Sequence, residues 1–139
     1  MKRKLIFLAL LFSAIFVWAQ DAAYHDFMAE GHRAYSGGDF SDAEYFFYNA
    51  MYLRPQEFAP YYYLGLVYYE NGDHNLAEYL FMASLHRGAD RALVSYALGL
   101  NAAAAGRLAD ALNHLDEAVT LEGSSFEAPV NELKRRLGL

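Results

Sequence analysis

The chain consists of short amphipathic stretches separated by breaks that contain glycine or proline. Over residues 58–71, apolar side chains recur at the spacing of one helix face. Gly72 then suits the left-handed backbone of a helix end, and Asp73 can cap the helix that follows. The second stretch carries its stripe of small and apolar side chains at Ala77, Leu80, Phe81 and Ser84. The pattern therefore predicts a helix–turn–helix unit over 58–91.

This unit occurs three times with a period of 34 residues. The copies run over 24–57, 58–91 and 92–125 without insertion or deletion. A shift of one period superimposes three columns of related side chains: Gly31, Gly65 and Gly99; Ala43, Ala77 and Ala111; and Phe47, Phe81 and Leu115. The third copy departs most, because Ser95 replaces an aromatic residue and Arg107 replaces the capping aspartate.

The small residues of these columns have a packing explanation. Two antiparallel helices approach closely only where one of them offers a notch without a bulky side chain. We therefore expect the three glycines to lie against Ala43, Ala77 and Ala111, with large side chains such as Phe47 and Phe81 filling the space around each notch. The columns are interpreted as structural.

On these residues the chain resembles the tetratricopeptide repeat family. Its pattern of a first-helix glycine, a small and an aromatic residue in the second helix and a closing proline is met best by Gly31, Ala43, Phe47, Ala50 and Pro55. The resemblance implies an all-α fold in which three helix–turn–helix repeats form a right-handed α-solenoid arc. It is far more specific for the fold than for a function.

Residues 126–139 are predicted to form a helix that caps the last repeat. Ser124 and Glu127 stand at capping-box spacing. The apolar face of this helix is expected at Val130, Leu133 and Leu137, and the basic run 134–136 suits a solvated helix C-terminus.

The first 19 residues have the three-part pattern of a secretory signal peptide. A basic start, Lys2-Arg3-Lys4, precedes an apolar run of 14 residues that ends at Trp18. Cleavage is expected between Ala19 and Gln20, followed by a short lead-in over 20–23. As a helix the run spans about 21 Å, short of the roughly 30 Å of a bilayer core. We therefore predict an exported, periplasmic or secreted protein without stable membrane insertion after cleavage, the alternative being an uncleaved anchor.

Charge and composition exclude several classes of partner. The net charge is −6, and without the three N-terminal basic residues the remaining 8 Lys and Arg face 17 Asp and Glu, a net charge of −9. Such acidity argues against nucleic acid as a partner, because phosphate binding needs clustered Lys and Arg. The chain has no cysteine, which excludes disulfides and thiolate chemistry. Its aromatic content is unusual, with 12 Tyr and 10 Phe.

The resemblance places the concave face of the arc on the first helix of each repeat. The residues expected there are mostly aromatic or aliphatic: His25, Met28, His32, Tyr35, Tyr62, Leu66, Tyr69, Leu93, Tyr96 and Leu100. Some proteins of this family bind a peptide C-terminal carboxylate with basic side chains on this face, and none of the ten is Lys or Arg. We therefore expect a protein or peptide with an apolar or aromatic segment as the partner.

Two other functions remain open at this stage. The same face could join copies of the chain into a homo-oligomeric scaffold, or the arc could hold a small apolar ligand. Enzymatic chemistry is not expected: His25 and His32 are about 10 Å apart along a helix, and Asp110 with His114 suits a surface pair. We predict no catalytic residue, no metal site and no cofactor.

Overall fold

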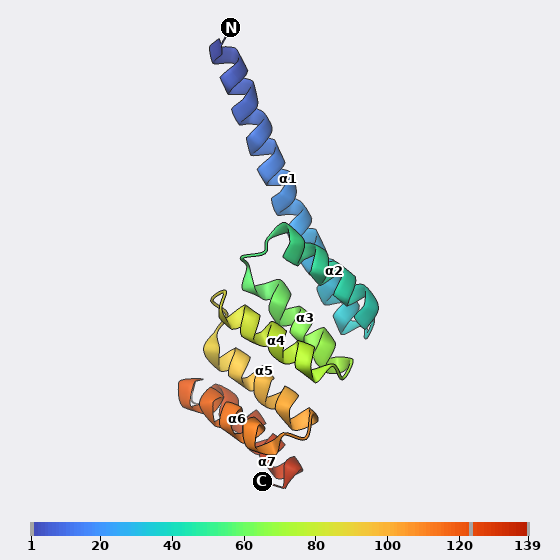
Figure 1. Ribbon diagram of the computed structural model, residues 1–139, viewed down its shortest axis with the longest axis vertical. Helices are drawn as coiled ribbons and strands as arrows, with labels where there is room; N and C mark the ends of the chain where they lie inside the picture. The colour runs from blue at the N-terminus through green and yellow to red at the C-terminus, as the bar shows by residue number, and fades with distance from the viewer. Residues whose placement is uncertain (1, 123, 139) are drawn as a thin grey trace. The chain divides into compact units, whose positions relative to one another are not determined.

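The computed structural model describes the backbone of residues 2–122 and 124–138, and the side chains within them except those of 2–11, 16 and 124. Its secondary structure is helical, as the sequence predicts (Figure 1). The helices are α1 (Lys2–Ser36), α2 (Phe40–Leu53), α3 (Phe58–Glu70), α4 (His74–Leu85), α5 (Arg91–Ala104), α6 (Leu108–Glu122) and α7 (Ser124–Leu137).

The chain divides into two compact units, Met1–Pro55 and Gln56–Leu139. In the first unit α1 packs against α2. In the second, α3 pairs with α4 and α5 with α6, while α4 also packs on α5 and α7 closes the series on α6. Three helix pairs and a closing helix thus confirm the predicted all-α class.

The ends of the helices follow the sequence signals. Gly38 and Gly72 both have φ of +79°, which is why glycine occupies these turns. The Asp39 carboxylate accepts from the backbone N–H of Asp42 at 3.1 Å, and the Asp73 carboxylate accepts from that of Leu76 at 3.2 Å. In the third pair Arg107 stands where the other pairs have the capping aspartate, as predicted from the sequence. Its guanidinium forms an ion pair with Glu78 of α4. A third capping aspartate, Asp90 at the start of α5, could not be recognised from the repeat pattern.

The glycine notches exist, and the large residues expected around them lie nearer to the glycines than the alanines do. A methyl group added to Gly31 would lie 2.6 Å from the Phe47 ring, and one added to Gly65 would lie 2.7 Å from Phe81. In the third pair the side chain nearest Gly99 is Leu115, again at 2.7 Å. Ala43, Ala77 and Ala111 are buried but are not the nearest neighbours. Each alanine lies one helical turn before the large residue that reaches the glycine.

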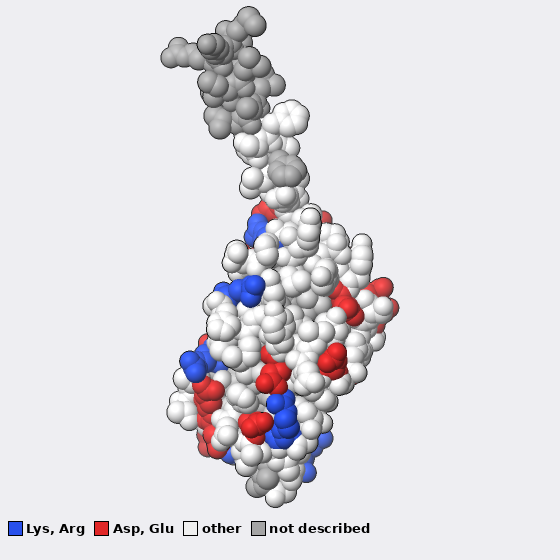
Figure 2. All heavy atoms as spheres, viewed as in Figure 1, with Lys and Arg blue, Asp and Glu red and all other residues white. Residues whose placement is uncertain are grey.

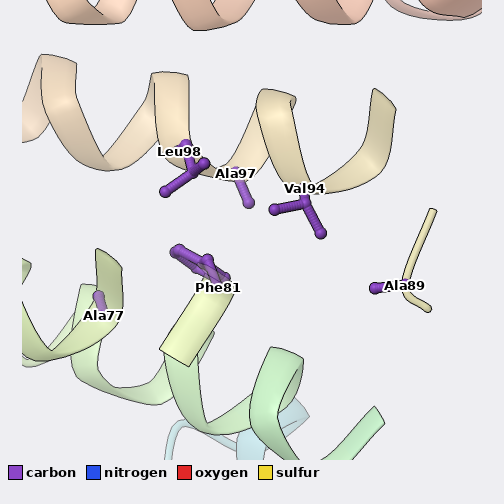
Figure 3. Packing of buried hydrophobic residues seen from close by; sticks show 6 residues of the cluster. All are labelled: Ala77, Phe81, Ala89, Val94, Ala97 and Leu98. Carbon is purple, nitrogen blue, oxygen red and sulfur yellow. The ribbon is translucent and has the colours of Figure 1, made fainter. Parts of the chain in front are cut away.

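Phe81 also connects α4 with α5. Its ring is 1% exposed and points toward Val94, Ala97 and Leu98 of α5 (Figure 3). Ala77 and Ala89 complete this cluster. Because one buried ring fills the space between the second and third pairs, these pairs share a continuous core.

Polar contacts replace apolar ones in parts of the second unit. Ser95, which is 3% exposed, donates to the Glu117 carboxylate at 3.0 Å, and Arg91 Nε donates to the same group at 2.9 Å. The buried side chain of Asn101 donates to the backbone carbonyl of His74 at 2.8 Å. Its amide oxygen lies 2.9 Å from His74 Nδ1. These bonds satisfy the buried polar groups of the third copy, Ser95 between α5 and α6 and Asn101 between α5 and α4.

The closing helix begins at Ser124, two residues before the expected start. Gly123 and the side chain of Ser124, which carries the predicted capping box, lie outside the described residues. Val130 is 1% exposed and anchors the helix. At its basic end Arg135 and Arg136 are exposed as expected, whereas Lys134 is half-buried and pairs with Asp116. Figure 2 shows such neighbouring blue and red side chains over the later helices.

The N-terminal segment continues directly into the first helix pair. α1 passes through the expected cleavage position between Ala19 and Gln20 without a break. No helix has a stretch long and apolar enough to span a membrane within the part of the chain that is described.

Candidate functional site

The ten residues predicted to bind a partner are divided between the two compact units. α1 of the first unit carries four of them, and α3 and α5 of the second unit carry six. Each group is therefore a surface of its own unit.

In the first unit the four residues have unlike surroundings. His25 is exposed and its Nε2 lies 3.9 Å from the Asp21 carboxylate. Met28 is only 9% exposed, so it contributes to packing and not to an accessible face. His32 is half-buried with its ring edge-on to Phe47, and this burial lowers the pKa of His32. Tyr35 packs on Phe40 with 5.7 Å between ring centroids.

In the second unit the six residues form a more uniform surface. All are half-buried, neither exposed nor enclosed: Tyr62, Leu66 and Tyr69 on α3, and Leu93, Tyr96 and Leu100 on α5. Tyr62, Leu66 and Tyr69 rest on the core cluster around Phe81. We call these six residues the α3–α5 face.

Two tyrosines of the α3–α5 face, Tyr62 and Tyr69, have raised pKa values, and Tyr96 contributes to both shifts. Burial raises the pKa of Tyr62 to about 12, with smaller contributions from Tyr63 and Tyr96. Burial also raises the pKa of Tyr69, with contributions from Glu70 and Tyr96. Both phenols therefore remain protonated at neutral pH. Their rings offer apolar surface and their hydroxyl groups can donate or accept hydrogen bonds.

Phe126 is a neighbour of this face that the sequence analysis missed. Its ring, at the start of α7, lies 5.0 Å from the ring of Tyr96 at an angle of 33°. The closing helix thus covers one side of Tyr96. The only signal in the sequence was an aromatic residue at the predicted helix start.

A second set of tyrosines, on α2, was also missed. Tyr45, Tyr48 and Tyr52 are 59%, 58% and 80% exposed. They lie off the buried stripe of α2, which consists of Ala43, Phe47 and Ala50. Their spacing of three and four residues was visible in the sequence, because such residues share a helix face. We call these three residues the α2 tyrosine face.

The histidines and acids that the sequence analysis considered lie in ordinary surface pairs. Asp110 forms an ion pair with Arg107 at 3.7 Å, and His114 Nδ1 lies 4.0 Å from the Glu117 carboxylate. In the described residues, no three His, Cys, Asp or Glu side chains gather in a group that could hold a metal ion.

No protein-family model matches the sequence, and no curated protein is similar enough in sequence to match it. Solved structures do match. The Arabidopsis OM64 TPR domain superposes with a TM-score of 0.75 and 17% identity, over 85% of this chain and 96% of that domain. The fold is that of a tetratricopeptide domain.

Two further structures agree. The N-terminal domain of stress-induced protein-1 (STI-1) from C. elegans has a TM-score of 0.66 and 21% identity, over 83% of this chain and 96% of that one. A mutant O-GlcNAc transferase from Thermobaculum terrenum has a TM-score of 0.70 and 23% identity, over 76% of this chain but only 20% of the transferase. At these identities the likeness concerns the tetratricopeptide fold alone.

Proposed function

We propose that this tetratricopeptide domain binds a protein or peptide, and that the α3–α5 face holds an apolar or aromatic segment of it. Tetratricopeptide domains are generally protein–protein interaction modules. The single observation that carries the proposal is the cluster of half-buried tyrosines on adjacent helices, Tyr62, Tyr69 and Tyr96. Tyrosine suits an interface because a large rigid ring with a polar tip is ordered at small entropic cost.

The size of this face fits a short segment of a partner. Each aromatic ring can bury about 150–250 Å² when a partner covers it. Three half-covered tyrosines together with Leu66, Leu93 and Leu100 therefore offer a patch of a few hundred Å², as expected for a functional surface. An extended peptide or one face of a helix would cover it.

The charge of the face favours a neutral or apolar segment. α3 has no Lys or Arg in its sequence, and Arg91, at the start of α5, is held by the Glu117 carboxylate. Capture of a C-terminal carboxylate would need cations aimed at the peptide end. We therefore do not propose that mode of binding.

The test is a comparison of two double variants in capture from the native envelope. Tyr62→Ala with Tyr96→Ala removes the rings, and we expect it to lose the partner. Tyr62→Phe with Tyr96→Phe keeps the rings and serves as the control that retains most capture. Because Tyr62 packs 5.7 Å from Phe81, thermal melting must show that both variants fold. Equal capture by the alanine variant would refute the proposal.

Self-association through the same face is the competing outcome. Sedimentation over a range of concentrations separates the two possibilities. A monomer throughout supports the binding module. A dimer that dissociates in the Tyr62→Ala, Tyr96→Ala variant would assign the face to a second copy of the chain.

We also propose that residues 1–19 direct export and are then removed, with an uncleaved anchor as the alternative. In support, Phe12, Ile15, Val17 and Trp18 are between 60% and 74% exposed. Among the described side chains that follow this segment, Asp21 pairs with Arg54 and Tyr24 is buried. Removal of the segment would therefore leave the core of the first unit unchanged. N-terminal sequencing of the protein from its native host tests this, and Met1 at the terminus would favour the anchor.

A further inference from the structure

The α2 tyrosine face is an exposed aromatic surface that the proposed function does not use. Its three rings lie on the side of α2 that faces away from α1, because Ala43, Phe47 and Ala50 form the buried side. Tyr45 also makes an edge contact with the ring of its neighbour Phe46. The fold of the helix pair does not require three large rings in solvent, so their presence suggests a partner.

A shallow hollow opens beside two of these rings. It has a volume of about 550 Å³ and is lined by Ser41, Glu44, Tyr45, Tyr48 and Asn49. All five residues belong to α2, and Asn49 is held in place by donating to the backbone carbonyl of Tyr45 at 2.7 Å. The hollow therefore combines aromatic walls with a carboxylate, an amide and a hydroxyl group.

The charge around the hollow is of one sign. α2 carries Asp42 and Glu44 in its first half and has no Lys or Arg in its sequence. Figure 2 shows acidic and no basic side chains at the N-terminal end of α2 on the face that it presents. A partner that places Arg or Lys beside the tyrosines would complement this charge.

The area and the spacing of the rings fit an extended proline-rich peptide better than a second copy of the chain. The exposed fractions of Tyr45, Tyr48 and Tyr52 amount to about two whole side chains, or about 300–500 Å², whereas a stable dimer buries about 800 Å² on each partner. Tyr45 and Tyr52 are about 10 Å apart along the helix. One turn of a polyproline II helix rises about 9 Å. Successive turns of the peptide can therefore meet Tyr45 and Tyr52, with Tyr48 between them.

We propose that the α2 tyrosine face binds a proline-rich segment in the polyproline II conformation, with Arg or Lys flanking the prolines. The prolines pack on the rings of Tyr45, Tyr48 and Tyr52, and the basic side chain meets Glu44. The rigid polyproline backbone loses little entropy on binding, so a small aromatic surface suffices for micromolar affinity.

The test is a titration of the full chain with a fluorescent peptide that has two Pro-x-x-Pro turns and flanking arginines. We expect saturable binding, which the Tyr48→Ala variant weakens at least about tenfold. Glu44→Gln should weaken binding less and reduce its dependence on salt. Tyr79→Ala is the control, because Tyr79 occupies on α4 the repeat position of Tyr45 and is likewise exposed, at 68%. This variant should leave the affinity unchanged.

Several results would overturn the inference. The absence of saturable binding to the wild-type chain would refute it, and so would equal binding of a peptide with alanine in place of proline. Unchanged affinity of a folded Tyr48→Ala variant would also refute it. A concentration-dependent dimer that Tyr48→Ala dissociates would assign the face to a second copy. The Tyr62→Ala, Tyr96→Ala variant should retain the peptide, so failure of this inference is distinguishable from failure of the proposed function.

Discussion

Replacement of Gly65 by alanine tests the packing of the second helix pair directly. The added methyl group would lie 2.7 Å from two carbons of the Phe81 ring. The ring cannot move aside easily, because it is 1% exposed and enclosed by the core cluster of α4 and α5. Overpacking of this kind costs about 1–3 kcal/mol, whereas alanine gains about 1 kcal/mol over glycine within a helix. We expect a net loss of up to about 2 kcal/mol in the free energy of unfolding.

A double-mutant cycle separates the two contributions. In a Phe81→Ala background, which itself costs about 3–5 kcal/mol, the clash is absent and Gly65→Ala should stabilise the protein by about 1 kcal/mol. Urea unfolding followed by circular dichroism measures the four free energies. A Phe81→Val background provides the same comparison if alanine proves too destabilising. An equal effect of Gly65→Ala with and without the Phe81 ring would show that the ring does not clash with the added methyl group.

Three further predictions concern a cap and two titrating groups. Asp73→Ala should lower the free energy of unfolding by about 1 kcal/mol. Asp73→Asn should largely preserve this free energy, because an asparagine oxygen can still accept from the backbone N–H of Leu76. Melting curves test both variants. The hydrogen bond from Arg91 lowers the pKa of Glu117 below its ordinary value of 4.5. The stability that ionised Glu117 contributes is therefore present above pH 4.5 and is lost on acidification. The stability difference between wild type and Glu117→Gln should therefore shrink in acid, and a constant difference would contradict this. Burial raises the pKa of Tyr62 from 10.0 to about 12, so the stability that its buried neutral phenol contributes to the fold should be lost as pH rises between these values. Ultraviolet titration should show one phenol that ionises at higher pH than the others, and Tyr62→Phe should remove that signal.

The pairwise helical organisation could be predicted from the sequence because its causes are local. The period of 34 residues repeats the same amphipathic stripes and the same turn chemistry. Gly38 and Gly72 take the left-handed backbone, and Asp39 and Asp73 cap the helices that follow, as their types indicate. Each of these features depends on a few neighbouring residues, so composition and order along the chain suffice.

Parts of the candidate sites could not be predicted, because they depend on residues far apart in the chain. Tyr96 meets Phe126 across 30 positions, and Ser95 meets Glu117 across 22. Met28 was expected on the accessible face with its neighbours but is buried. A helical stripe tells which residues share a face, but not how deeply a neighbouring helix covers each of them.

The sequence by itself determined the number and kind of helical units, their turns and caps, and the enrichment in tyrosine. Only the tertiary structure decided that Phe47, Phe81 and Leu115 occupy the notches at Gly31, Gly65 and Gly99. It also decided which tyrosines remain accessible. The physical reason is that the axial offset between two packed helices selects one of several residues on the same stripe. That offset is set by the shapes of all the side chains in the interface together.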